Sequence, residues 1–369
     1  MYFRSKFNCY QYLFMRSVFY FFIIWIVLPF SSLAQQDSFH RISPNEAGFS
    51  SGSLDKLAAF LERSGTSSMV LAYDGKVFFE WGDIYEKHTI HSIRKAMLNS
   101  LYGIYVEKGI IDTSLTLKDL NIDDIEPSLT ETEKSARIAD LLKSRSGVYH
   151  AAAAVADGMA TQKPPRGSHK PNEAYYYNNW DFNVLGAIFE KLTGKSIYKA
   201  FYQDIAVPLE MKQYQGAYDT VTANDNSTSI PETDGFYQYE RDKSQYPAYH
   251  FRMSAHDLAL YGTLYLNNGK WDGQQIIPSD WIEVSTTSYS VTNPYMDFGY
   301  GMLWNVMNKN EKRTSKSFYH TGVGIHMLAV YPASKLVFVH RVDTEGEYNF
   351  PQENLYKIIS MIFTAQTSS

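Results

Sequence analysis

The chain has 369 residues and a formal net charge of −5 at neutral pH. This acidic balance argues against nucleic acid as a partner, and a hydrophobic content of 44% is enough for a sizeable core. The sequence shows no internal repeat or low-complexity tract, and its one cysteine, Cys9, argues against a disulfide framework.

The first 34 residues have the pattern of a signal peptide. A basic residue precedes the apolar run from Val18 to Phe30, and Ser32-Leu33-Ala34 supplies small residues ahead of a cleavage point. The run is short for a membrane span, so cleavage after Ala34 is favoured over an uncleaved anchor. We therefore expect a periplasmic or secreted mature protein with no integral membrane span. Whether translation starts at Met1 or Met15 stays open.

A helix and a hairpin come next. Apolar residues at helical spacing predict a helix over residues 53–63. Two β-prone runs, 69–73 and 76–81, flank Asp74-Gly75, a dipeptide typical of a two-residue hairpin turn. A second helix is predicted over 93–108 from its apolar spacing.

Ser92 and Lys95 stand at the start of this second helix. A hydroxyl and an amine three residues apart share a helix face, so the lysine can accept the serine's proton. Backbone N–H groups at a helix N-terminus also favour a developing oxyanion. The same spacing recurs at Ser53 and at Ser196, which we interpret as helix-capping serines followed by solvent-facing lysines.

The middle of the chain, about 104–290, is predicted to be mostly helix and loop. Within it, Tyr177 and Asn179 fall in the loop before an amphipathic helix that starts at Trp180. Aromatic residues make up 15% of the chain and cluster here, which favours core and cleft wall over a base-stacking or carbohydrate platform.

The last part of the chain returns to β-structure. His320-Thr321-Gly322 leads into an apolar run over 327–331, which pairs with 335–342 as a second hairpin before a closing helix over 354–363. Both chain ends then build one antiparallel sheet flanked by helices, an α/β architecture forming one domain over about 40–366. The ten histidines lack metal-ligand spacing, so we expect no metal and no cofactor.

Three motifs, in this order, carry a family resemblance: Ser92-Ile93-Arg94-Lys95, Tyr177-Asn178-Asn179 and His320-Thr321-Gly322. The chain resembles the serine β-lactamase and penicillin-binding-protein superfamily, in particular the branch of class C β-lactamases, DD-carboxypeptidases, D-aminopeptidases and related esterases. The resemblance implies a β-lactamase-like fold with the nucleophile at the junction of the sheet and the helical region.

The resemblance also implies roles. Ser92 would form an acyl-enzyme with Lys95 as proton acceptor, and Tyr177 would pass a proton to the leaving group and activate the deacylating water. The N–H groups of Ser92 and Val323 would form the oxyanion hole. The other residues assigned to substrate binding are Asn179, His320, Thr321, Gly322, Tyr149 and Trp180.

Three features depart from the β-lactamases. His320 stands where lysine is usual, the run from Val323 to His326 replaces a glycine-rich one, and Arg94 is atypical. We therefore expect a serine hydrolase for small or peptide-like esters or amides, with a β-lactamase or DD-carboxypeptidase as one alternative and a non-catalytic peptidoglycan- or ligand-binding relative as the other. The sequence leaves open the identity of the substrate and the oligomeric state. It also leaves open whether the protein hydrolyses β-lactams or is only acylated by them.

Overall fold

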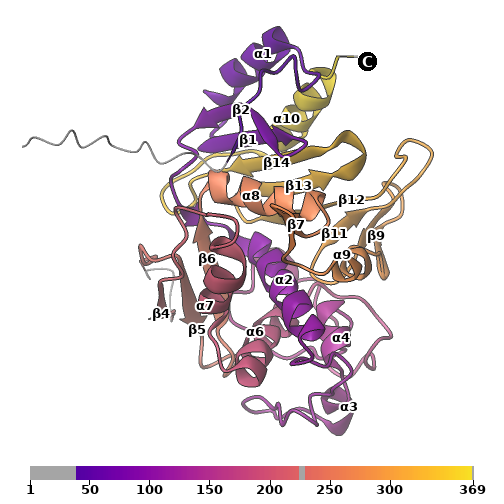
Figure 1. Ribbon diagram of the computed structural model, residues 1–369. Helices are drawn as coiled ribbons and strands as arrows, with labels where there is room; N and C mark the ends of the chain where they lie inside the picture. Colours follow the sequence, from indigo (N-terminus) through magenta and orange to yellow (C-terminus); the bar gives the residue numbers. More distant parts are fainter. Residues whose placement is uncertain (1–38, 224–228, 368–369) are drawn as a thin grey trace, which may run out of the picture. The chain divides into compact units, whose positions relative to one another are not determined.

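An eight-stranded antiparallel sheet organises the part of the chain that the computed structural model describes, residues 39–223 and 229–367 (Figure 1). The predicted signal peptide lies outside the described residues. The strand order is β2-β1-β14-β13-β12-β11-β10-β9. The strands are β1 (Ser68–Tyr73), β2 (Lys76–Gly82), β9 (Ser290–Asn293), β10 (Phe298–Tyr300), β11 (Asn305–Met307), β12 (Ser317–Gly322), β13 (His326–Tyr331) and β14 (Leu336–Arg341).

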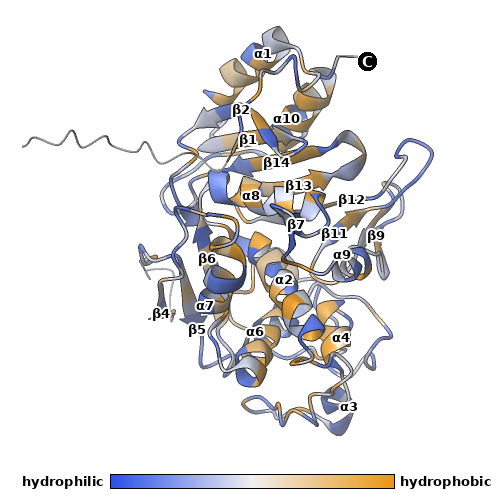
Figure 2. Ribbon diagram, viewed as in Figure 1, coloured by the Kyte–Doolittle hydropathy of each residue, from blue (hydrophilic) through white to orange (hydrophobic). Residues whose placement is uncertain are grey.

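Helices cover both faces of this sheet (Figure 1). α1 (Ser51–Leu61) and α10 (Gln352–Thr364) pack against one face, and α8 (Ala255–Leu266) packs against the other. Successive side chains of a strand point to opposite faces, so a strand covered on both sides needs apolar residues at most positions. β14 is accordingly buried at all of its positions, and the apolar residues of β13 are orange in Figure 2.

Both ends of the described chain contribute to the sheet. β1 pairs with β14 from Ser68↔Arg341 to Tyr73↔Leu336, and Phe49 forms an isolated bridge with Gln366. This arrangement confirms the predicted α/β fold with an antiparallel sheet built from both chain ends. The predicted hairpins and the first and last helices lie within a few residues of those observed.

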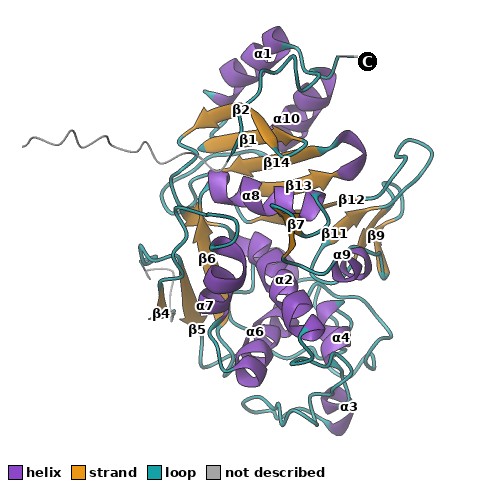
Figure 3. Cartoon of the chain, viewed as in Figure 1, coloured by secondary structure: helices purple, strands orange, loops and turns teal. Residues whose placement is uncertain are grey.

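The middle region differs from the prediction because it contains a second sheet (Figure 3). Its order is β3-β6-β5-β4, with β4 and β5 parallel. The sequence of its central strand alternates between apolar and polar residues from Tyr249 to Met253, yet the structure buries every position, including His250 and Arg252. The strands are β3 (His88–Thr89), β4 (Tyr218–Thr222), β5 (Gly235–Tyr239) and β6 (Ala248–Met253); a small separate hairpin pairs β7 (Lys270–Trp271) with β8 (Gln274–Gln275).

Helices joined by long loops make up the rest of this region. They are α2 (Arg94–Glu107), α3 (Glu131–Lys134), α4 (Ile138–Leu142), α5 (Asp157–Ala160), α6 (Asn179–Thr193), α7 (Ile197–Phe201) and α9 (Ser279–Ser285). α2 is buried on every side from Arg94 to Tyr105, so it is a central helix rather than an amphipathic surface one. Among the described residues, no helix is both long and apolar enough to cross a bilayer.

Candidate active site

The nucleophile candidate lies in a 3-10 turn, His91–Ile93, directly before α2. The helix predicted from residue 93 thus begins at Arg94, one residue later. Lys95 Nζ lies 3.0 Å from Ser92 Oγ, within hydrogen-bond distance. Ser92 is partly exposed whereas Lys95 is only 1% exposed, so the hydroxyl can be approached while the amine is shielded from water.

Lys95 has an environment that disfavours its charged form. Burial lowers the pKa of Lys95 well below its ordinary value, and the neighbouring Arg94 charge lowers it further. The amine packs 4.9 Å from the ring centre of Tyr177 and 4.5 Å from that of Phe182. No carboxylate of the described chain forms an ion pair with Lys95, so no negative charge there raises its pKa.

Tyr177 reaches the same place from the loop before α6. Burial raises the pKa of Tyr177 to about 12, although its hydrogen bond with Ser92 works in the opposite direction. Tyr177 is therefore a neutral phenol in contact with the nucleophile. Asn179 is the first residue of α6 rather than a loop residue, and its side-chain amide donates to the Ala154 carbonyl at 2.5 Å.

The start of α6 is held by two neighbours of Tyr177. Asn178 caps the helix by accepting from the Trp180 N–H, and its amide donates to the Val148 carbonyl at 2.7 Å. Trp180 Nε1 donates to Asp124 Oδ2 at 2.7 Å, and the Trp180 side chain is fully buried. Trp180 is thus a core residue that anchors the helix, which corrects the expectation that it lines the cleft.

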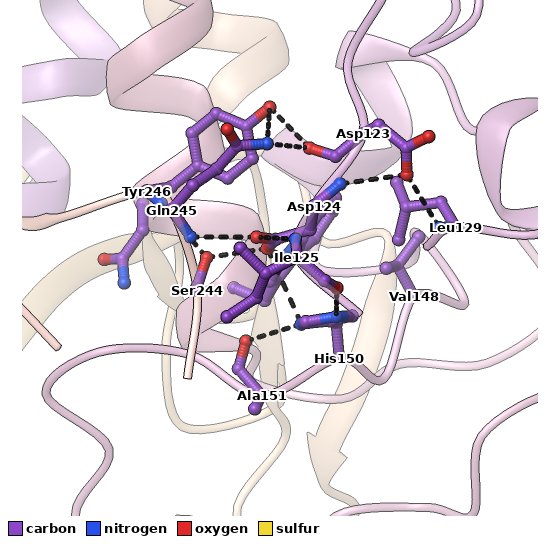
Figure 4. A network of polar contacts seen from close by, with 12 residues as sticks. Asp123, Asp124, Ile125, Leu129, Val148, His150, Ala151, Ser244, Gln245 and Tyr246 are labelled. Carbon is purple, nitrogen blue, oxygen red and sulfur yellow. Dashed lines mark hydrogen bonds and ion pairs between the residues drawn. The ribbon is translucent and has the colours of Figure 1, made fainter. Parts of the chain in front are cut away.

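Asp124 is the centre of a buried polar network (Figure 4). Its carboxylate also accepts from Ser244 Oγ at 2.6 Å and from the Gln245 N–H at 2.9 Å. His150 lies beside it, with Nδ1 3.5 Å from Asp124 Oδ2. The network connects segments that are distant in the chain to the start of α6. Tyr149, the other expected wall residue, is 3% exposed, and its hydroxyl lies 3.0 Å from His169 Nδ1.

The third motif ends β12, beside the nucleophile turn. His320 is fully buried, and its Nε2 bonds to the Leu303 carbonyl. Burial lowers the pKa of His320 to about 3. His320 is therefore neutral at physiological pH and provides no positive charge beside the nucleophile. No hydrogen bond joins it to Tyr177 in the described chain.

Thr321 and Gly322 face different surroundings. Thr321 lines an apolar groove of ≈ 760 Å³ on the α10 side of the sheet, together with Met327 and Ile359. Gly322 instead packs on the nucleophile segment: a Cβ there would lie 2.7 Å from the Ile90 carbonyl oxygen and 3.1 Å from His91 Cβ. Val323 follows directly after the end of β12, and its side chain is 51% exposed.

The sequence reasoning missed several residues that contact these groups. Phe182 packs on Lys95, and Asn183 and Tyr249 hold the Arg94 side chain. Phe182 follows Asn179 by three residues, so the helix period after Tyr-x-Asn could have indicated it. Tyr249 is distant in sequence and gave no signal. No cluster of three or more metal-ligating side chains occurs within the described ranges.

Comparison with solved structures gives the same fold. A penicillin-binding-protein homologue from Pyrococcus abyssi aligns at 18% identity and a TM-score of 0.60, over 86% of this chain and 78% of its own. A D-alanine carboxypeptidase from Burkholderia cenocepacia aligns at 15% identity and a TM-score of 0.56, over 85% and 97%. A β-lactamase from Mycobacterium bovis aligns at 14% and 0.55, over 85% and 97%.

Comparison of the sequence with curated proteins yields no match. The family model described as Beta-lactamase, however, matches residues 56–358, which span all three motifs. That match indicates a serine hydrolase fold. The sheet formed by both chain ends and the penicillin-binding-protein-like neighbours agree with it. The chain therefore belongs to the Beta-lactamase family.

Proposed function

We propose that this protein is a serine hydrolase that works through an acyl-enzyme on Ser92. The observation that carries this proposal is the 3.0 Å separation of Lys95 Nζ and Ser92 Oγ, with the amine buried and without an ion pair among the described residues. An uncharged amine beside a hydroxyl is the arrangement that a general base needs. Tyr177 supplies a neutral phenol at the same oxygen.

The chemistry follows from these protonation states. As Ser92 Oγ attacks the substrate carbonyl, Lys95 takes its proton and becomes an ammonium, and the carbonyl oxygen becomes an oxyanion. The resemblance assigns that oxyanion to the N–H groups of Ser92 and Val323. Tyr177 donates its phenolic proton to the leaving group and regains one from Lys95. Water then attacks the acyl-enzyme, giving up a proton along the same path, and Ser92 is released.

We further propose that the substrate is an uncharged ester or amide, small or peptide-like. His320 is neutral because burial lowers its pKa to about 3, so it gives no positive charge to attract a substrate carboxylate. β-Lactams and DD-peptides carry such a carboxylate. We therefore rank β-lactamase and DD-carboxypeptidase activity below ester or amide hydrolysis and expect β-lactams to act at most as slow acylating agents.

The proposed place of action is the periplasm or the exterior, after cleavage behind Ala34. The support is the apolar run followed by small residues. N-terminal sequencing of protein from a periplasmic or culture fraction should begin at Gln35. Retention of Met1 or Met15 would argue for an anchor instead.

Covalent labelling tests the acyl-enzyme directly. A fluorophosphonate and a fluorescent penicillin are applied in parallel, and intact mass followed by peptide mapping locates the adduct. We expect one fluorophosphonate adduct at Ser92, none in Ser92→Ala, and normal labelling in Ser196→Ala, because Ser196 caps α7 through its hydroxyl. Absence of any adduct in the folded wild type would favour the non-catalytic alternative.

A further inference from the structure

Arg94 carries a buried charge that no acid neutralises. It is 3% exposed, and its guanidinium donates to the Tyr249 carbonyl at 2.6 Å and to Asn183 Oδ1 at 3.3 Å. The guanidinium carbon also lies 4.3 Å from the centre of the Tyr249 ring. All of these partners are neutral, and no ion pair of Arg94 occurs in the described chain.

Such a charge is expensive to bury, because buried charges are normally paired. Arginine nevertheless keeps its proton in proteins, whereas a buried lysine loses its proton readily. Arg94 and Lys95 are adjacent in sequence and both buried. When two cations share one site of low dielectric constant, the weaker base gives up its proton. The pair therefore settles as a charged arginine and a neutral lysine.

We propose that Arg94 is a positioning residue of the acyl-transfer site, whose fixed positive charge adds to burial in keeping Lys95 in the uncharged form that accepts the Ser92 proton. This inference rests on the proposed function and goes beyond it, because it assigns the control of the base to a residue that does not touch the substrate.

The other titratable groups facing Lys95 are neutral. Tyr177, before α6, is a phenol, and burial lowers the pKa values of three nearby histidines: His91 to about 4, His320 to about 3, and His250 well below the ordinary value. These histidines come from the nucleophile turn, β12 and β6. No acidic group influences Lys95 from these elements. Arg94 is thus the fixed charge that acts on it.

Asn183 offers a way to cancel that charge without removing the arginine. Its Oδ1 accepts from Arg94, and its Nδ2 donates to the Ala153 carbonyl at 3.2 Å. Asn183→Asp would place a carboxylate against the guanidinium and keep the side-chain size. Asn183→Ala loses the bond to Ala153 in the same way but adds no charge, so it is the matched control.

The test measures the protonation of Lys95 without relying on turnover. The folded protein is treated with trace acetic anhydride across a range of pH, and peptide mass spectrometry gives the pH midpoint of Lys95 acetylation. We expect a midpoint well below that of an exposed lysine in the wild type. Arg94→Met and Asn183→Asp should both raise it, by about one to three pH units, the usual effect of a nearby charge. Asn183→Ala should leave it unchanged.

A parallel pH profile of Ser92 labelling by the fluorophosphonate should move its acid limb upward in the same two variants and recover its plateau at high pH, which mere loss of packing would not do. Equal midpoints in wild type and both charge variants would overturn the inference, as would an equal shift in Asn183→Ala. If Arg94→Met does not fold, the Asn183 pair decides alone. If Lys95 shifts as expected but Ser92 never labels, the proposed function fails and the control of Lys95 by Arg94 stands.

Discussion

Replacing Gly322 by alanine should displace the nucleophile turn. The new Cβ would lie 2.7 Å from the Ile90 carbonyl oxygen, which is backbone and cannot rotate away. Ordinary carbon–oxygen contacts are about 3.3–3.6 Å, so β12 and residues 90–91 must separate by roughly 0.6–0.9 Å. Overpacking of this kind costs about 1–3 kcal/mol. Because a misplacement of about 1 Å can cost about a hundredfold in rate, we expect a 10- to 100-fold slower reaction of Ser92.

The assay combines two measurements on each variant: the second-order rate constant of fluorophosphonate labelling and the free energy of unfolding in urea. Gly262→Ala is the matched control, because its Cβ would lie 2.5 Å from Val337 Cγ1, in the α8–sheet contact. It should lose comparable stability and keep its labelling rate. Gly52→Ala, in open space on α1, should change neither rate nor fold.

The reasoning would be refuted by a Gly322→Ala variant that is destabilised like Gly262→Ala but labels at the wild-type rate. That result would show that β12 does not set the position of Ser92.

Three further predictions concern the proton donor, acid stability and the α6 anchor. Tyr177→Phe should lower kcat on a nitrophenyl ester by about a hundredfold or more with little change in KM, the usual scale of a positioned proton-transfer group; an unimpaired variant would remove tyrosine from the mechanism. The pKa values of His91 and His340 are lowered to about 4 by burial, and that of His320 to about 3. Below about pH 6.5 these histidines bind protons in the unfolded chain but not in the folded protein. The free energy of unfolding should therefore fall on acidification by about 1.4 kcal/mol per pH unit for each histidine, down to about pH 4. Urea unfolding that is unchanged between pH 7.5 and 5 would contradict this. Trp180→Phe leaves the Asp124 carboxylate with one donor fewer and should cost about 1–3 kcal/mol, while an equally stable variant would deny the network that role.

Local patterns were predictable from the sequence, and contacts between distant segments were not. The Ser92–Lys95 pairing depends on three residues of helical spacing, and the hairpins depend on turn residues beside β-prone runs, so both could be anticipated. Arg94 was visible only as an atypical residue, because its partners Asn183 and Tyr249 lie on α6 and β6.

The errors have the same origin. An aromatic residue beside a motif can line a cleft or anchor a core, and Trp180 does the second because Asp124, far away in the chain, offers its indole an acceptor. The neutral state of His320 likewise depends on its burial, in part against the Trp304 ring, which a sequence pattern does not reveal. The second sheet was missed although its central strand alternates between apolar and polar residues from Tyr249 to Met253, a pattern that indicates a strand.

The pairing of β1 with β14 also limits when the sheet can fold during synthesis of the chain. During synthesis the first hairpin leaves the ribosome long before β14, the strand that pairs with its inner edge. Contacts between residues so far apart in sequence form slowly, and an unpaired apolar strand edge is prone to aggregation until another strand pairs with it. A nascent or prematurely terminated chain ending before Leu336 therefore lacks β14, one of the strands against which α8 packs. Such chains should depend on chaperones or be degraded, because β14 joins β1 to β13 in the sheet.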